Sequence, residues 1–212
     1  LLAKGGWSTG KQIEVYSEIS NQRDEQGGVL IWQYYLNDIE ESGAALGITR
    51  PTIYLAAPRY LNSIVDHYHF ANFLYWGVLR TAYAQEIGQQ YLAYLQECYS
   101  NEMVWQHHRQ QLQQVIELQH RGELNIVEET SSARKLIVIV YPNLKDIAAT
   151  RSMSDKVADF FERQGVPVVN MADLLSGFSP KEITVNALDG HANEMVNRLL
   201  AEHLYKNFFP PK

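Results

Sequence analysis

Three short runs of β-forming residues place the strongest limit on how this chain folds. They are VLIWQYY at 29–35, LIVIVY at 136–141 and VPVVN at 166–170. Runs that are apolar at nearly every position are typical of parallel strands buried on both faces of a sheet. Helical patterns follow them, with Ser152 or Ser154 expected to cap one helix and Asn193 to begin the last. Strands that alternate with helices predict an α/β fold.

The interval between the first two runs is long and mostly helical. Apolar and aromatic residues recur at helical spacing in its second half: Trp105, His108, Leu112, Val115 and Ile116. The loops of an ordinary crossover between parallel strands are far shorter. The spacing therefore predicts a helical cap inserted at about 55–125 into a single domain that spans residues 1–212.

Composition excludes several classes of function. Lys and Arg number 18 and Asp and Glu number 24, a net charge of −6, so no nucleic-acid partner is expected. The single cysteine, Cys98, allows neither an intrachain disulfide nor a cysteine-based metal cluster, and is expected to be a small apolar residue on a helix. The most apolar run, at 71–79, is much shorter than the ~20 residues that cross a bilayer. We expect no cofactor, no metal and no transmembrane segment.

Two further groups of residues allow both a structural and a functional interpretation. The cap contains an aromatic cluster made of Phe70, Phe73, Tyr75, Trp76 and Tyr83. We predict that it packs the cap against the main domain, with an acyl-chain or carbohydrate pocket as the alternative. The cap also contains two histidine pairs, His67 with His69 and His107 with His108. We predict that they lie on solvated helix faces, with a metal site as the alternative.

The N-terminal segment contains the pattern Gly-x-Ser-x-Gly, at residues 6–10. In a nucleophile elbow this pattern joins a strand to a helix, and most of the sheet precedes it. Only seven residues precede Ser8. Ser8 is therefore predicted to be a loop residue and not a nucleophile.

Polar residues at two distant positions suggest a single site. Asn37 and Asp38 follow the first strand, and Asp189, Gly190 and His191 precede the last helix. In open α/β sheets, ligands bind beyond the carboxyl ends of the strands, where both stretches are expected. A turn and helix cap at 37–38, and a surface histidine near a helix start, are the alternatives.

Each of these residues has a role in acyl transfer. His191 is a candidate general base, and Asp189 is a candidate acceptor that fixes the imidazole tautomer. The Asn37 amide and the backbone N–H of Gly6 are candidate donors to an oxyanion, since a glycine lets the substrate approach the backbone closely.

The same segments resemble the conserved blocks of the SGNH, or GDSL-type, hydrolases. LAKGGWSTGKQI is similar to their second block, YLND to their third, and LDGHANEMVNRLLAEHLY to their last. The resemblance implies a flavodoxin-like, three-layer α/β/α sheet fold. It also implies that Gly6 and Asn37 are oxyanion donors and that Asp189 and His191 belong to a catalytic triad. Gly5 and Gly6 are not separated by the pattern.

Three features depart from that family. Its first block, which carries the nucleophilic serine, has no counterpart here, and we expect it upstream of Leu1. Tyr35 replaces the glycine of the third block, and one residue instead of two separates Asp189 from His191. The resemblance implies a serine esterase that acts on a lipid, an acetylated sugar or another small ester. A polysaccharide O-acyltransferase and a non-catalytic binding module on the same fold are the alternatives.

Overall fold

A parallel sheet of three strands forms the centre of the protein in a computed structural model, which describes residues 8–22, 29–51, 59–118, 135–187 and 189–209. The strands are β1 (Val29–Tyr35), β2 (Lys135–Tyr141) and β3 (Val168–Asn170), in the order β1-β2-β3. Tyr35 pairs with Tyr141, and Val140 pairs with Asn170. All three predicted strands are confirmed. The third begins two residues later than expected, because its pairing with β2 starts at Val168.

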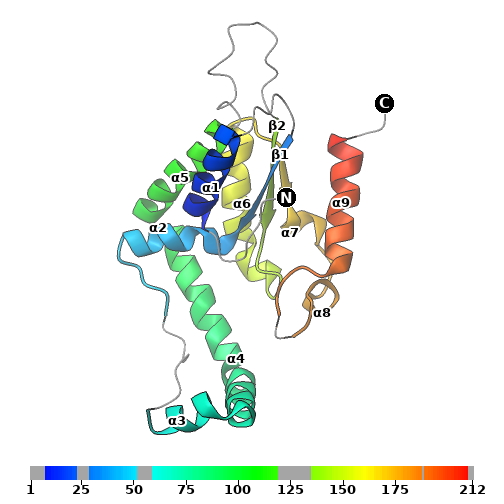
Figure 1. The fold of residues 1–212 in the computed structure, drawn as a ribbon. Coiled ribbons are helices and arrows are strands. Elements are labelled where there is room, and N and C mark those ends of the chain that lie inside the picture. The colour runs from blue at the N-terminus through cyan, green and yellow to red at the C-terminus, as the bar shows by residue number, and fades with distance from the viewer. Residues whose placement is uncertain (1–7, 23–28, 52–58, 119–134, 188, 210–212) are drawn as a thin grey trace, which may run out of the picture.

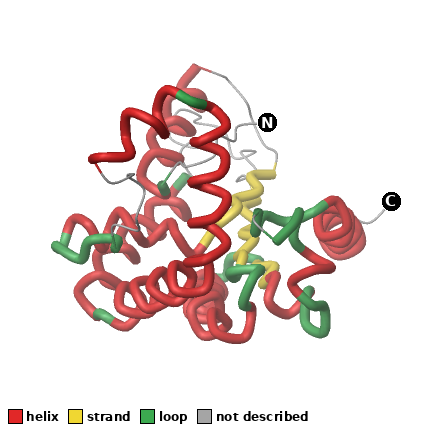
Figure 2. The backbone as a smooth tube through the Cα atoms, turned by 90° about the horizontal axis from the view of Figure 1, so that it is seen from below, coloured by secondary structure: helices red, strands yellow, loops and turns green. Residues whose placement is uncertain are grey.

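Helices account for most of the remaining described residues. Before β2 the chain forms α1 (Thr9–Gln22), the 3₁₀ turn η1 (Leu36–Ile39), α2 (Glu40–Ala45), α3 (Arg59–His67), α4 (His69–Ser100) and α5 (Glu102–Glu117). After β2 it forms α6 (Ile147–Arg163), α7 (Met171–Leu174), α8 (Pro180–Ile183) and α9 (Glu194–Phe208). The protein is therefore a mixed α/β structure in which helices flank a parallel sheet (Figures 1 and 2).

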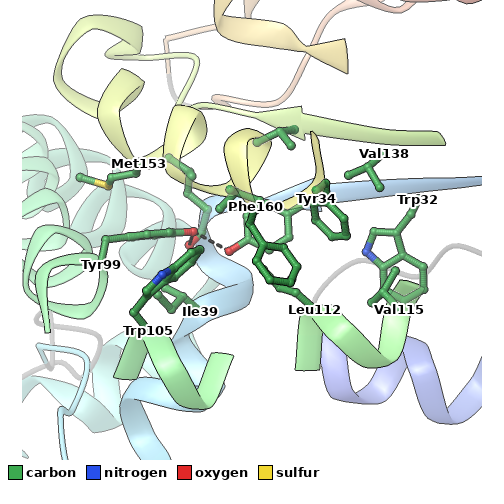
Figure 3. Close-up of a cluster of buried hydrophobic side chains, with 14 of the residues drawn as sticks. Trp32, Tyr34, Ile39, Tyr99, Trp105, Leu112, Val115, Val138, Met153 and Phe160 are labelled. Carbon is green, nitrogen blue, oxygen red and sulfur yellow. Dashed lines mark hydrogen bonds between the residues drawn. The ribbon is translucent and has the colours of Figure 1, made fainter. Parts of the chain in front are cut away.

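One face of the sheet carries the larger hydrophobic core. Trp32 and Tyr34 of β1 and Val138 of β2 point into it, and they meet side chains of α1, α4, α5 and α6 (Figure 3). The five α5 positions predicted from helical spacing are all buried there. Burying an aliphatic or aromatic side chain of this size typically stabilises a fold by about 1.5–3 kcal/mol. Cys98 is fully buried on α4 within the same core, in agreement with its predicted structural role.

The opposite face of the sheet is covered unevenly. A second core joins Ile139 and Tyr141 of β2 to α7 and α9. It does not extend over β1, where Ile31 is 41% exposed, whereas its neighbour on β2, Ile137, is 0% exposed. Within the described residues, this leaves the β1 side of one face open to solvent.

The helix boundaries follow local capping. The prediction that α6 begins at Ser152 or Ser154 is wrong, because Asp146 caps it by accepting from the Ala149 N–H at 3.0 Å. Ser154 lies within the helix and donates to the Arg151 carbonyl instead. The predicted start of the last helix is confirmed, since the Asn193 side chain accepts from the Val196 N–H at 3.1 Å.

The helical interval between β1 and β2 has two parts. The second half of α4 and all of α5 belong to the main core, whereas α3 and the first part of α4 project away from the body (Figure 1). The prediction that the aromatic cluster packs against the main domain is wrong for Phe70 and Phe73, which are each 73% exposed. The Tyr83 side chain lies outside the described residues. Across the described part of the chain, no helix is long and apolar enough to cross a membrane.

Candidate functional site

The loop that carries Asp189 and His191 is closed by its own hydrogen bonds. Thr184 and Ala192 form an isolated antiparallel bridge, and the Val185 N–H donates to the His191 carbonyl at 3.0 Å. Asn193 ends the loop, and its Nδ2 donates to the Glu182 carbonyl at 2.7 Å. A loop pinned at both ends holds its side chains in a fixed direction at the start of α9.

Asp189 and His191 form a direct pair. His191 Nδ1 lies 2.5 Å from Asp189 Oδ1, and the His191 backbone N–H donates to the same oxygen at 3.0 Å. These two hydrogen bonds lower the pKa of the Asp189 carboxyl. The His191 side chain is 83% exposed. With Nδ1–H donated to the carboxylate, the neutral imidazole presents the Nε2 lone pair, and this tautomer is the one that suits a general base.

Gly190 lets this loop approach the loop that follows β2. A Cβ atom at Gly190 would lie 2.9 Å from Cε of Lys145. The Lys145 ammonium also donates to the Ala187 carbonyl at 3.1 Å. The His191 loop is thereby attached to the carboxyl end of the central strand.

Asn37 lies in η1, directly after β1. Its neighbours hold the turn: the buried Asp38 accepts from the Tyr35 N–H at 3.1 Å, and the Tyr99 hydroxyl donates to the Leu36 carbonyl at 3.1 Å. The Asn37 side chain is exposed and has no hydrogen-bond partner among the described residues. An amide held in this way is free to donate to a ligand.

Asp38 has an unusual environment for a carboxyl group. Burial raises its pKa to about 7, the hydrogen bond from the Tyr35 N–H opposes this rise, and the charges of Glu40 and Glu41 add to it. Tyr35 stacks on Tyr141 with 4.8 Å between ring centroids. Asp38 therefore has the structural role in the turn that was the alternative for residues 37–38, whereas the Asn37 side chain remains available for binding.

Both halves of the predicted site lie at the carboxyl edge of the sheet. Asn37 follows β1, and the Lys145 loop that contacts Gly190 follows the adjacent β2. No described contact joins Asn37 to Asp189 or His191. Gly6, the second predicted oxyanion donor, lies outside the described residues. The structure therefore brings together Asp189 and His191, and it places Asn37 at the end of a neighbouring strand.

Ser8 is a helix cap. Its carbonyl accepts from the Gln12 N–H at 2.9 Å, and its Oγ accepts from the Lys11 N–H at 3.4 Å, at the start of α1. Serine is among the preferred residues at this position. Its contacts with α1 give Ser8 a structural role.

The sequence did not reveal a buried polar network beneath η1. His108 Nε2 lies 2.9 Å from the Tyr34 hydroxyl, which lies 2.6 Å from the Tyr99 hydroxyl, and His108 Nδ1 lies 3.1 Å from Gln111 Oε1. Burial lowers the pKa of His108 to about 4. The prediction that His108 lies on a solvated face is therefore wrong. Its position in the apolar spacing of α5 was the signal for burial.

The remaining candidates do not form a site. Among the described residues, no group of three or more His, Cys, Asp or Glu side chains could hold a metal ion. A hollow of about 340 Å³ lies between α5 and α6, lined by Gln106, Arg109, Gln110, Gln113, Phe160 and Gln164. None of the predicted site residues lines it, so we do not assign the chemistry there.

No protein-family model, curated protein or solved structure matches this chain significantly. Its own residues and their contacts are therefore the basis for a functional interpretation.

Proposed function

We propose that this chain belongs to a serine ester hydrolase of the SGNH type. His191 is the general base, Asp189 orients it, and Asn37 and Gly6 donate hydrogen bonds to the oxyanion. The single observation that carries the proposal is the 2.5 Å contact between His191 Nδ1 and Asp189 Oδ1, combined with an imidazole that is open to solvent. A histidine oriented by a carboxylate, with its second nitrogen accessible, is the arrangement that activates a hydroxyl nucleophile.

The reaction follows from these roles. A serine hydroxyl transfers its proton to His191 Nε2 while its oxygen attacks the ester carbonyl. His191 then returns the proton to the leaving alcohol, and water hydrolyses the resulting acyl-enzyme in the same way. Among the described residues, the hydrogen bonds of His191 involve no serine hydroxyl. We propose that the serine comes from another part of the natural protein.

The open side of β1 supports a contribution from further chain. Val29 and Ile31 are exposed, although the β2 partner of Ile31, Ile137, is fully buried, and β1 pairs with only one strand among the described residues. An unpaired strand edge with exposed apolar side chains favours pairing with another segment. A flavodoxin-like sheet with an additional strand beside β1 would pair this edge and bring its serine loop to the carboxyl edge.

Exposure of His191 favours hydrolysis over transfer to a sugar. A transferase must exclude water from the acyl-enzyme, whereas the His191 side chain is 83% exposed. The polysaccharide O-acyltransferase is therefore the second candidate. The substrate we propose is a carboxylic ester, without a choice between lipid, acetylated sugar and other small esters.

A fluorophosphonate probe on the complete natural protein tests the proposal. We expect covalent labelling that His191→Ala abolishes and that His69→Ala, a matched change at an exposed histidine, leaves unchanged. Labelling that survives His191→Ala would overturn the assignment of the base. A folded protein without any labelling would favour a binding module. Acylated sugar as the main product, when a sugar acceptor is present, would favour the transferase.

A further inference from the structure

An arm of the molecule, defined as α3 together with residues 68–78, projects beyond the body (Figure 1). Within the arm, α3 packs along the first part of α4, and the Asn72 amide donates to the Val65 carbonyl at 3.2 Å. The side chains of Ala71, Asn72, Tyr75 and Trp76 are half-buried. The arm is therefore a pair of helices that contact each other along one side.

The outer face of the arm is apolar. Phe70, Leu74 and Val78 follow one another at intervals of four residues, with Phe73 beside them, so they line one side of the helix. Ile64 and Tyr68 add two more exposed side chains. A stripe of this kind would normally face a core.

The size of this surface calls for a partner. Six large, exposed apolar side chains present on the order of 600 Å², at or above the largest apolar patch of a typical monomer. Because Phe70 and Phe73 are each 73% exposed, the fold itself gains little from them. Their burial is available to something that binds the arm.

The charge pattern indicates what the partner is. Between Asp66 and Arg80 the sequence contains no Asp, Glu, Lys or Arg. Helices that pair with a second copy usually carry charged residues beside the apolar stripe, and these set partner and register. This stretch instead carries Tyr68, Tyr75 and Trp76, whose rings combine an apolar body with a polar tip and which favour the boundary between lipid and water.

We propose that the arm inserts Phe70, Phe73, Leu74 and Val78 into the surface of a lipid layer with neutral or zwitterionic headgroups. The stretch offers no cluster of lysine and arginine for anionic lipids, and the chain's net charge of −6 opposes them. Binding is therefore driven by apolar burial and depends little on salt. The arm projects past the end of the sheet at which the strands finish, so docking places the His191 loop on the side that faces the lipid (Figure 1). The docking itself does not depend on the proposed hydrolase activity.

Flotation with phosphatidylcholine vesicles tests the proposal on the complete natural protein. We expect the protein to float with the vesicles at low and high salt alike, and the double variant Phe70→Ser with Phe73→Ser to bind at least about tenfold more weakly. The matched control is Leu46→Ser with Met103→Ser, which removes two exposed apolar side chains elsewhere on the surface. Circular dichroism and thermal unfolding verify that each variant is folded, which we expect because all four side chains are exposed.

Four outcomes would overturn the proposal. One is a protein that does not float at any lipid concentration, and another is equal binding by the arm variant and the control variant. The third is a protein that ignores vesicles but is a dimer in light scattering, with the arm variant monomeric, because the arm would then pair with a second copy. Binding that appears only with anionic vesicles and disappears at high salt would also contradict apolar insertion.

Discussion

His108 and His191 are hydrogen-bonded in opposite environments. His108 lies on α5 inside the main core, is fully buried, and uses both ring nitrogens within the protein. His191 lies on a surface loop, uses Nδ1 for Asp189, and is largely exposed. Burial lowers the pKa of His108 to about 4. His108 nevertheless has no access to a substrate.

The comparison separates two uses of a polar residue. A buried histidine whose partners satisfy both nitrogens fixes the packing of tyrosines and glutamine around it. A histidine with one satisfied and one open nitrogen is prepared for proton transfer. The shifted pKa of His108 reflects its burial, whereas the role proposed for His191 depends on an accessible nitrogen atom.

The largest effect is expected from Asp189→Asn, which removes the carboxylate that pairs with His191. Its amide favours the wrong imidazole tautomer, and a loss of about 10⁴-fold in kcat is typical when the carboxylate of such a triad is replaced. The measurement is ester hydrolysis by the complete natural protein. Asp159→Asn, a change at an exposed carboxylate on α6, serves as the control and should retain full activity. Equal rates for the two variants would remove Asp189 from the mechanism.

Asp38→Asn tests the second buried ionisable group, the carboxyl group of Asp38. Because the folded-state pKa of Asp38 is about 7, above its usual value near 4, the folded protein binds more protons between these pH values. The stability contributed by Asp38 therefore falls as pH rises through this window. Relative to Asp38→Asn, wild-type protein should lose about 3 kcal/mol of unfolding free energy from pH 5 to pH 8.

Urea unfolding at the two pH values measures this loss. Asn at position 38 keeps an oxygen that can accept from the Tyr35 N–H, so the comparison isolates ionisation from hydrogen bonding. Glu117→Gln, at an exposed position, should not change the pH dependence. A difference between wild type and Asp38→Asn that is constant with pH would mean that Asp38 ionises normally.

His108→Gln should have the opposite pH dependence. The folded-state pKa of His108 is about 4, below its usual value of 6.5, so its neutral form stabilises the fold above pH 6.5 and this contribution is lost as pH falls towards 4. Relative to the variant, wild-type protein should lose about 2 kcal/mol from pH 7 to pH 5. Urea unfolding measures it, with His69→Gln as the exposed control. If His108→Gln and His69→Gln lost the same unfolding free energy from pH 7 to pH 5, the result would contradict a buried, neutral His108.

The smallest effect is expected at Asn193, which anchors the His191 loop to α9. Asn193→Ala removes the cap on the Val196 N–H and the donor to the Glu182 carbonyl, and should cost about 1 kcal/mol of unfolding free energy. Asn193→Asp keeps the cap and loses only the donor, so it should cost less. Thermal unfolding distinguishes the two variants. Equal costs would mean that the donor to Glu182, and not the cap, holds the loop.

Much of the sheet was predictable because buried parallel strands have a distinctive composition. The runs at 29–35 and 136–141 are apolar enough to be recognised without any tertiary information. The start of α6 was not, because several polar residues near it are suitable caps and only the chain direction after β2 selects Asp146. The sequence also shows that the segment around Phe70 and Phe73 is rich in apolar and aromatic residues. Composition does not say whether protein, lipid or water covers such residues, and Phe70 and Phe73 were therefore misplaced.

The candidate site was predictable in its local part only. Asp189 and His191 are two residues apart, so a single turn was enough to bring them together. The position of Asn37 relative to them depends on three strands and their loops, which no short motif encodes. The environment of Asp38 likewise depends on residues that are far apart in the sequence, such as Tyr99 above the same turn.

The length of α4 has a structural consequence. At 32 residues it is about 48 Å long, and it runs without interruption from the projecting arm into the core. Near its inner end the Tyr91 hydroxyl donates to Glu40 at 2.5 Å, and Tyr99 holds the carbonyl of Leu36, directly beside Asn37. One continuous helix therefore joins the projecting arm to the turn that presents the Asn37 amide.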